Sequence, residues 1–268
     1  MANFAIGAHK ISERRACRLA VLSRSGYRYV RKKSNDQEIQ AKLTKIAEGH
    51  PRWGFRKMAA FLRKQGNQWN HKKVYRIYCE MGLNLRVKAK KRLPTRNPQP
   101  LLQPETTNAC WSLDFMSDSL DNGRPFRTFN VLDDFNREGL WIEIDLSLPA
   151  ARVTRVLDMI ASWRGYPKQV RVDNGPEFIS HHMAAWAKIH AVQIHFIQPG
   201  KPAQNGFVER FNRTYREEVL DAYLFSSLDE ARTITVEWLE EYNSIRPHSA
   251  LENKTPFEFS ANLESVYL

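Results

Sequence analysis

The spacing of the apolar residues in this chain changes close to residue 105. Before that point apolar residues recur at intervals of three and four, as Ile39, Leu43 and Ile46 do, which is typical of amphipathic helices. After it, apolar and polar residues alternate over residues 140–148, which is typical of a half-buried strand. The change predicts a helical region followed by a longer region that contains a sheet.

The net charge of the chain changes sign at the same place. Residues 1–104 contain 25 lysines and arginines against 5 aspartates and glutamates, whereas residues 105–268 contain 16 against 24. The formal charges are therefore +20 and −8. A surplus as large as +20 is typical of a part that binds a polyanion, and an acidic part needs cations before it can approach phosphates. We interpret the chain as a DNA-binding part joined to a part that uses metal ions.

Several classes of protein are excluded by composition. No apolar stretch approaches the ~20 residues that span a bilayer, and the first residues lack the basic and apolar regions of a signal peptide. We therefore predict a cytoplasmic protein without membrane contact. Cys17, Cys79 and Cys110 are far apart and have no metal-binding spacing, so neither a disulfide scaffold nor a zinc module is expected.

The basic part is predicted to contain a helix-turn-helix. The spacing predicts helices over residues 12–22, 35–49, 55–65 and 70–81, with a Gln-Gly turn between the last two. The final helix presents a basic face that suits the major groove, although a solvated face on a small helical bundle is the alternative. The candidate DNA contacts on it are His71, Lys72, Lys73 and Arg76.

The predicted domain boundaries follow from these patterns. Residues 1–34 form an N-terminal helical segment with a second, weaker helix-turn-helix pattern, and residues 35–85 form the basic helix-turn-helix domain. Residues 86–104 combine six basic residues with four prolines, which is typical of a linker. That linker either lies along DNA or acts as a solvated hinge. Residues 105–268 form the catalytic core with a helical C-terminal tail.

The acidic part is predicted to be an α/β fold. Its strands and helices alternate in the order βββαβαβα, which predicts a mixed five-stranded sheet with flanking helices. The expected strands cover residues 111–115, 126–133, 140–148, 169–173 and 193–197, and the expected helices cover 150–163, 180–190, 204–220 and 228–242.

Three carboxylates occupy special positions in this expected core. Asp114 lies in the first strand, Asp173 ends the fourth strand, and Glu209 lies in the first turns of the helix after the fifth strand. If the first and fourth strands are neighbours, the three acids form a cup for hard divalent cations. Two Mg²⁺ ions in such a cup would suit phosphodiester cleavage. Ordinary surface acids are the alternative.

Polar neighbours of these acids are further candidates. Asn174 and Glu177 either form the turn that presents Asp173 or support the catalytic group. Lys201, Gln204 and Asn205 precede the Glu209 helix, where backbone amides favour phosphate. Together with Arg213 on that helix, these three residues are candidate DNA contacts.

Several strings in the sequence resemble one known family. The strings WSLDF (111–115), VDNGPEF (172–178) and QPGKPAQNGFVERFN (198–212) resemble the catalytic core of insertion-sequence transposases, as does YNSIRPHSAL (242–251). In the basic part, SERR (12–15), HPRWGFR (50–56) and NHKKVYR (70–76) are similar to the insertion-sequence-3 family. The match runs nearly end to end and indicates the second-frame product of such an element.

The resemblance implies an RNase H-like core in which Asp114, Asp173 and Glu209 are catalytic and bind two Mg²⁺ ions, with Mn²⁺ as a substitute. It implies nicking of the 3′ ends of the element and strand transfer into target DNA. The implied partners are the terminal repeats, target DNA, other copies of the chain in a multimer and an upstream-frame product, in a bacterial, nucleoid-associated setting. A non-catalytic DNA-binding regulator or remnant and an RNase H-like nuclease are the alternatives. His248, within the Arg-Pro-His string, receives no role.

Overall fold

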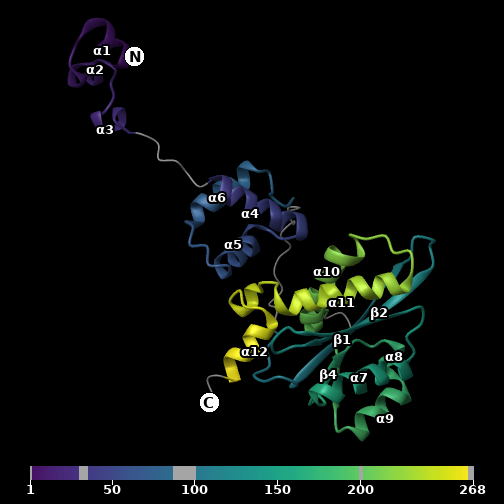
Figure 1. Ribbon diagram of the computed structural model, residues 1–268. Coiled ribbons are helices and arrows are strands. Elements are labelled where there is room, and N and C mark those ends of the chain that lie inside the picture. Colours follow the sequence, from purple (N-terminus) through teal and green to yellow (C-terminus); the bar gives the residue numbers. More distant parts are fainter. Residues whose placement is uncertain (1, 30–35, 87–100, 199–201, 265–268) are drawn as a thin grey trace. The chain divides into compact units, whose positions relative to one another are not determined.

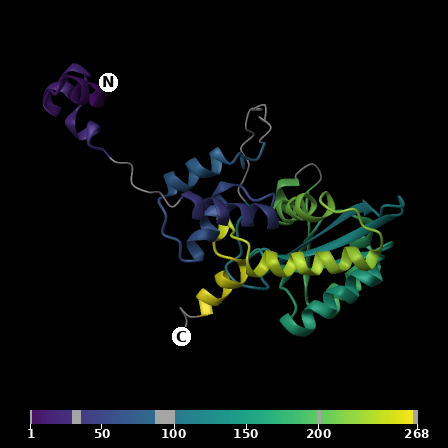
Figure 2. The same ribbon diagram turned by 45° about the horizontal axis from the view of Figure 1, so that its top comes forward.

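The computed structural model describes residues 2–29, 36–86, 101–198 and 202–264 (Figures 1 and 2). It divides into two compact units, Met1–Lys45 and Ile46–Leu268. Most of the predicted linker, residues 87–100, lies outside the described residues. Within the described ranges, no helix is both long enough and apolar enough to cross a membrane.

The first unit consists of short capped helices. Ser12 and Ser23 each accept a hydrogen bond from a backbone N–H three residues later, so each satisfies one of the free amides at a helix start. The Tyr27 hydroxyl donates to Asn3 Oδ1 at 2.6 Å. The helices are α1 (Ala2–His9), which the sequence pattern did not predict, α2 (Glu13–Leu19), α3 (Arg24–Tyr27) and the first part of α4 (Asp36–Gly49).

The second unit begins with the predicted helix-turn-helix. Helices α5 (Phe55–Lys64) and α6 (His71–Glu80) confirm the expected pair. Gly66 in the turn has φ +82°, a backbone conformation that glycine adopts without steric cost. Asn70 caps α6 by accepting a hydrogen bond from the amide of Lys72 at 2.9 Å.

A five-stranded mixed sheet forms the centre of the second unit. The first three strands form the predicted antiparallel meander, and β1 and β4 are parallel neighbours, as the three-carboxylate hypothesis required. Strand β5 pairs in parallel with β4. In the order that they take across the sheet, the strands are β3 (Gly139–Asp145), β2 (Pro125–Asp133), β1 (Cys110–Ser119), β4 (Gln169–Val172) and β5 (Gln193–Phe196).

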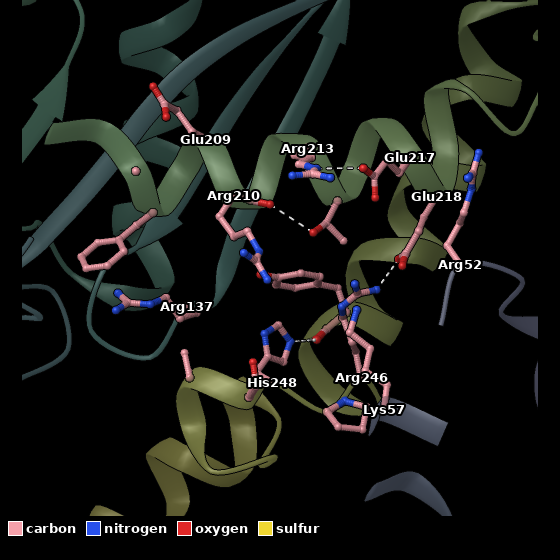
Figure 3. Close-up of a pocket in the computed structure, with 17 residues that line it drawn as sticks. Arg52, Lys57, Arg137, Glu209, Arg210, Arg213, Glu217, Glu218, Arg246 and His248 are labelled. Atoms are coloured by element: carbon pink, nitrogen blue, oxygen red, sulfur yellow. Dashed lines mark hydrogen bonds and ion pairs between the residues drawn. The ribbon is translucent and has the colours of Figure 1, made fainter. Parts of the chain in front are cut away.

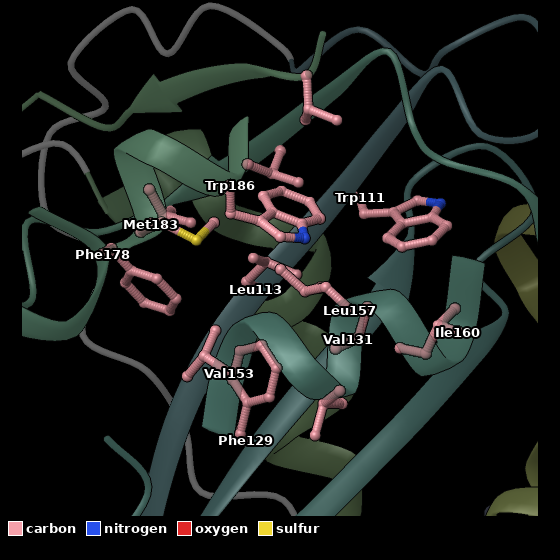
Figure 4. Packing of buried hydrophobic residues seen from close by; sticks show 14 of the residues in the cluster. Trp111, Leu113, Phe129, Val131, Val153, Leu157, Ile160, Phe178, Met183 and Trp186 are labelled. Carbon is pink, nitrogen blue, oxygen red and sulfur yellow. The ribbon is translucent and has the colours of Figure 1, made fainter. Parts of the chain in front are cut away.

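Helices cover both faces of this sheet (Figures 1 and 2). On one face, Trp111 and Leu113 of β1 pack with Leu157 and Trp186 in one apolar core (Figure 4). On the other face, Phe211 and Tyr215 lie in a second core together with residues of β2 and β3. The first face carries α7 (Ala150–Arg164), α8 (Pro176–Ile179) and α9 (His181–Ile189), and the second carries α10 (Gly206–Tyr215) and α11 (Leu228–Ser244).

A buried carboxylate joins the central strands. Asp134 follows β2, and its two oxygens accept from Ser112 Oγ at 2.6 Å and from Arg171 Nη1 at 2.5 Å. Ser112 and Arg171 are partners in the β1–β4 register. Burial raises the pKa of Asp134, although Arg171 and the Ser112 bond act in the opposite direction. One acid therefore ties together β1, β4 and the end of β2.

Further elements of the second unit differ from the sequence prediction. The helix expected over residues 204–220 is a 3₁₀ turn (Pro202–Asn205), then α10, then a π-helical turn (Arg216–Leu220). The π turn holds one more residue than an α turn, and both Val219 and Leu220 are buried there. Helices α8 and α12 (Pro256–Glu264) were not predicted; each begins at a proline, a residue that suits the first position of a helix.

Gly139 generates the first prediction, because it lies where the sheet meets α10 and α11. A Cβ atom there would come within 2.5 Å of Leu239 Cδ1 and 2.8 Å of Phe211 Cε2. Gly139→Ala should therefore lower the free energy of unfolding of the core by about 1–3 kcal/mol through overpacking, measured by urea denaturation. Gly206→Ala is the matched control, since nothing lies within 4 Å of that Cβ position. Equal stability of the two variants would contradict this account of the packing.

Candidate active site

Asp114 lies in the central strand with its carboxylate largely buried. Its Oδ1 accepts from the Phe115 amide at 2.9 Å, and its Oδ2 accepts from Asn212 Nδ2 of α10 at 2.7 Å. Burial raises the pKa of Asp114 to about 6, and the charges of Asp173 and Glu209 act in the same direction. Burial and, to a smaller extent, neighbouring negative charge thus disfavour the ionised form of this carboxylate.

Asp173 comes directly after β4. Because Ser112 pairs with Arg171 in the parallel register, continuing that register by two residues places Asp173 level with Asp114. Its Oδ1 accepts from the Gly175 amide at 2.9 Å, an Asx turn that orients the carboxylate. A Cβ on Gly175 would lie 2.9 Å from the same oxygen, so glycine suits this turn.

Glu209 lies in the first turn of α10, and its side chain is exposed. Partial burial raises its pKa, and its carboxylate makes no hydrogen bond within the described part of the chain. The opposite face of this turn is held by Val208 and Phe211 in the second core. The helix therefore presents Glu209 from a fixed position.

Asp173 and Glu209 both lie within electrostatic range of Asp114, but the three carboxylates are not gathered into one cluster. Both Asp173 and Glu209 act on the pKa of Asp114. Among the residues that the structure describes, however, no three His, Cys, Asp or Glu side chains lie close enough to hold one metal ion. The donor set consists only of carboxylate oxygens, which are the ligands that hard divalent cations prefer.

Two asparagines behind Asp114 were missed by the sequence reasoning. Asn130 Nδ2 of β2 donates to Asn212 Oδ1 at 2.6 Å, and Asn212 in turn donates to Asp114. Both asparagines are buried. The position of Asn212, one helical turn after Glu209, was the available signal, but a strand partner such as Asn130 cannot be read from local spacing.

The predicted neighbours of Asp173 have their own contacts. Asn174 Nδ2 donates to the Ile197 carbonyl at 3.1 Å, which connects the turn to the end of β5. Glu177 pairs with Arg127 of β2 at 2.5 Å. Burial alone would raise the pKa of Glu177, but the bond from Arg127 gives a net lowering.

The predicted DNA contacts differ in how available they are. On α6, Lys72 is exposed, whereas Arg76 pairs with Glu80 at 2.7 Å and His71 packs edge-on against Phe55. Lys73 is half-buried.

The contacts expected before α10 are mostly engaged within the protein. Lys201 lies outside the described residues. Gln204 Oε1 accepts from the Gln198 amide at 2.8 Å. Asn205 is buried and donates to the Leu113 carbonyl at 3.4 Å, so its side chain faces β1 and not solvent. Arg213 is exposed and pairs with Glu217 at 2.8 Å.

A hollow of about 780 Å³ lies beside α10 (Figure 3). Its lining comes from five parts of the second unit: the segment that leads into the first turn of α5, the turn after β2, α10 with its π turn, the end of α11, and the Arg-Pro-His segment. Glu209 is at its edge, with the carboxylate directed away from the basic residues (Figure 3). The charged residues of the lining are Arg52, Lys57, Arg137, Glu209, Arg210, Arg213, Glu217, Glu218 and Arg246.

Arg246 and His248 of the Arg-Pro-His string make contacts within the protein. Arg246 is buried and forms an ion pair with Glu218 of the π turn. His248 Nε2 lies 3.2 Å from the Tyr242 carbonyl; since a carbonyl can only accept, Nε2 carries the proton. Burial lowers the pKa of His248 to about 3, and Arg246 and Lys57 act in the same direction. The imidazole is therefore neutral at the base of the hollow.

Family comparisons agree with this architecture. Residues 104–202 and 190–256 each match a model described as an integrase core domain, and residues 33–92 match one described as an HTH-like domain. The 39.2 kDa protein of insertion element IS476 of Xanthomonas euvesicatoria is 42% identical over 94% of this chain and 73% of its own length. The 31.7 kDa protein of insertion element IS407 of Burkholderia multivorans is 42% identical over 94% and 91%.

A solved structure supports the fold. The simian T-cell lymphotropic virus intasome, determined with a regulatory subunit of PP2A, aligns at a TM-score of 0.51 with 18% identity, over 82% of this chain and 74% of the viral chain. Fold and matches together define an RNase H-like integrase core preceded by a DNA-binding helix-turn-helix region. The chain belongs to the insertion-sequence-3 family of transposases, as a second-frame product. Its class of activity is therefore polynucleotidyl transfer.

His248 generates the second prediction. Its pKa is about 3 in the folded protein against 6.5 ordinarily, so the unfolded chain binds a proton first as the pH falls. This group therefore leaves the free energy of unfolding unchanged above pH 6.5 and lowers it progressively as the pH falls from 6.5 toward 3; the loss is about 2 kcal/mol at pH 5. Denaturant unfolding at pH 7 and at pH 5 measures this loss. Between these two values the free energy of unfolding should fall less in His248→Gln than in the wild type, by about this amount. The exposed His181→Gln should behave like the wild type, and identical pH dependence of all three proteins would contradict the burial argument.

Proposed function

We propose that the transposase nicks the 3′ ends of its element and joins each released 3′-hydroxyl to target DNA, with Asp114, Asp173 and Glu209 as catalytic residues. The observation that carries this proposal is the parallel pairing of β1 with β4, which sets Asp114 level with Asp173. Helix α10 adds Glu209 within electrostatic range of Asp114. No covalent enzyme intermediate is required, and each joining step conserves the number of phosphodiester bonds.

The same three carboxylates are the residues that would hold divalent metal. The integrase core family generally uses such ions, and we propose two Mg²⁺ ions here, with Mn²⁺ as a substitute. Bound there, they would supply activation of the attacking oxygen and stabilisation of the leaving oxygen. The donor set supports this, because Asp173 Oδ2 and both Glu209 oxygens make no hydrogen bond to another described residue. Glu177 is already paired with Arg127 and would support Asp173 only indirectly.

The proposed division of labour follows the charge. Residues 35–85 would bind duplex DNA through α6, chiefly by the exposed Lys72, and residues 1–34 would add a second helical contact. Residues 86–104 would connect them to the core at residues 105–268. Multimers of this chain on the terminal repeats and target DNA are proposed from the likeness to a structure described as an intasome. Cooperation with an upstream-frame product and association with the nucleoid are parts of the same proposal.

A non-catalytic regulator and a plain nuclease remain the rival functions. A regulator needs no acids level on neighbouring strands, whereas this chain retains all three carboxylates and orients two of them by hydrogen bonds. A nuclease would cut without joining. The experiment that separates the three functions therefore measures cutting and joining together.

The test of the proposed function uses a duplex that carries the terminal repeat found beside the gene, with Mg²⁺ or Mn²⁺. The wild type should nick and join. Glu209→Gln and Asp173→Asn should each lose at least about 100-fold of both activities, because each loses a charged ligand. Glu240→Gln, an exposed acid on α11, is the matched control and should remain active.

The outcomes of that assay separate the rivals. Cutting by the wild type without any joining would favour the nuclease, and binding without reaction, even with the upstream-frame product added, would favour the regulator. Full activity of Asp173→Asn would remove Asp173 from the site.

Asn212 generates a further prediction. Its amide orients Asp114, and Asn130 fixes the orientation of that amide. Removing a group that orients a metal ligand typically costs 10–100-fold. Asn212→Ala should therefore reduce joining by about that factor and raise the metal concentration needed for half-maximal rate. Asn122→Ala, whose side chain serves only a hairpin turn, should change neither quantity. An unchanged metal dependence in Asn212→Ala would show that the asparagine is merely structural.

A further inference from the structure

The hollow beside α10 is strongly basic. Six cations line it against three carboxylates. The cations come from segments that are far apart in sequence, so only the tertiary structure gathers them. In Figure 3 the labelled basic residues surround the hollow, while the Glu209 carboxylate is directed away from it.

Half of these cations already have partners. Arg213 pairs with Glu217, and Arg246 pairs with Glu218. Arg137 donates to the Asp134 carbonyl and lies 3.4 Å from the centre of the Phe207 ring. The two carboxylates nearest the cations, those of Glu217 and Glu218, are therefore already engaged.

The other three cations are available. Arg52, Lys57 and Arg210 form no ion pair or side-chain hydrogen bond with any residue in the described ranges. Lys57 is crowded as well: burial lowers its pKa to about 8, and the nearby charges of Arg246 and Arg210 contribute. Crowded, unpaired cations are unfavourable until an anion joins them.

The position of the hollow indicates which anion. Arg210 is the residue after Glu209, so the two side chains leave the same turn of α10 in different directions. DNA that presents a reacting phosphodiester to Glu209 carries further phosphates on both sides of it. A strand that crosses the start of α10 therefore brings a neighbouring phosphate to Arg210.

We propose that this hollow binds a phosphate of the DNA strand next to the reacting phosphodiester, held by Arg52, Lys57 and Arg210. That the anion belongs to the reacting strand rests on the proposed function; that the hollow binds a phosphate rests on its own residues. Arg52 and Lys57 belong to the start of the helix-turn-helix, whereas Arg210 belongs to the core. A bound strand would therefore be held by both parts at once.

The proposal also explains the Arg-Pro-His string. Arg246 forms an ion pair with Glu218, whose carboxylate would otherwise be able to pair with the cations of the hollow. His248 remains neutral and donates to the Tyr242 carbonyl, so it closes the base without adding charge. The string would act by shaping the hollow and not by touching the reacting atoms.

The first test measures binding of the full chain to a 20-base-pair duplex in EDTA over a series of salt concentrations. Each phosphate contact contributes about 0.9 to the slope of log K against log salt. The double variant Lys57→Gln/Arg210→Gln, which loses this single phosphate contact, should therefore lower the slope by about one and weaken binding about tenfold at low salt. The matched control, Lys188→Gln/Arg155→Gln, removes two exposed cations of the core and should leave both unchanged. Equal slopes for the two double variants would overturn the proposal.

The second test uses the wild-type chain and so does not depend on the folding of a variant. An amine-acetylating reagent at pH 8 should modify Lys57, and the saturating duplex should protect it at least about fivefold while leaving Lys188 reactive. Inorganic phosphate is the comparison arm. Protection by phosphate but not by the duplex would assign the site to a free anion and overturn the DNA proposal, as would unchanged reactivity of Lys57 with the duplex.

These readouts are independent of catalysis. If the salt slope falls and Lys57 is protected but no nicking occurs, even with the upstream-frame product added, the hollow binds DNA and the proposed function fails. If nicking and joining occur while Lys57 stays reactive, the proposed function holds and this inference fails.

Discussion

The parallel pairing of β1 with β4 is the constraint on which the rest of the core depends. These strands are more than fifty residues apart in sequence, and their register is supported by Asp134, which accepts from Ser112 on one strand and Arg171 on the other. Because parallel strands end at the same edge of a sheet, this register sets Asp114 and Asp173 level. A slip of one residue would turn the side chains of β4 to the wrong faces.

Helix α10 adds the third carboxylate of the candidate site to these two strands. Its apolar side, with Phe211 and Tyr215, is buried in the second core, and Asn212 connects it to Asp114. The same helix carries Glu209, whose charge acts on the pKa of Asp114, and Arg210, which lines the basic hollow (Figure 3). Charges of opposite sign can therefore stand one residue apart, because successive residues of a helix point about 100° apart. The carboxylate of Glu209 suits a metal ion, and the guanidinium of Arg210 suits a phosphate.

Much of the fold could be predicted from the sequence, because its signals are local. The alternation over residues 140–148 predicted β3, and the spacing of Ile39, Leu43 and Ile46 predicted the buried side of α4. The π turn was not predictable, since it depends on burying Val219 and Leu220 together. The roles of candidate DNA contacts were equally hidden: Asn205 is buried beneath β1 and Arg76 is paired with Glu80. The spacing of charged and polar residues shows which groups are present, but not which are already engaged.

The sequence by itself determined the class of the protein: a basic helix-turn-helix, an α/β core and three acids in strings typical of one transposase family. It could do so because helical period, strand alternation and charge are properties of neighbouring residues. Only the tertiary structure decided that Asn130 and Asn212 orient Asp114, and that Arg52, Lys57 and Arg210 surround one hollow. These groups come from positions up to 158 residues apart in the sequence, and hydrogen bonds and charge crowding act through space and not along the chain.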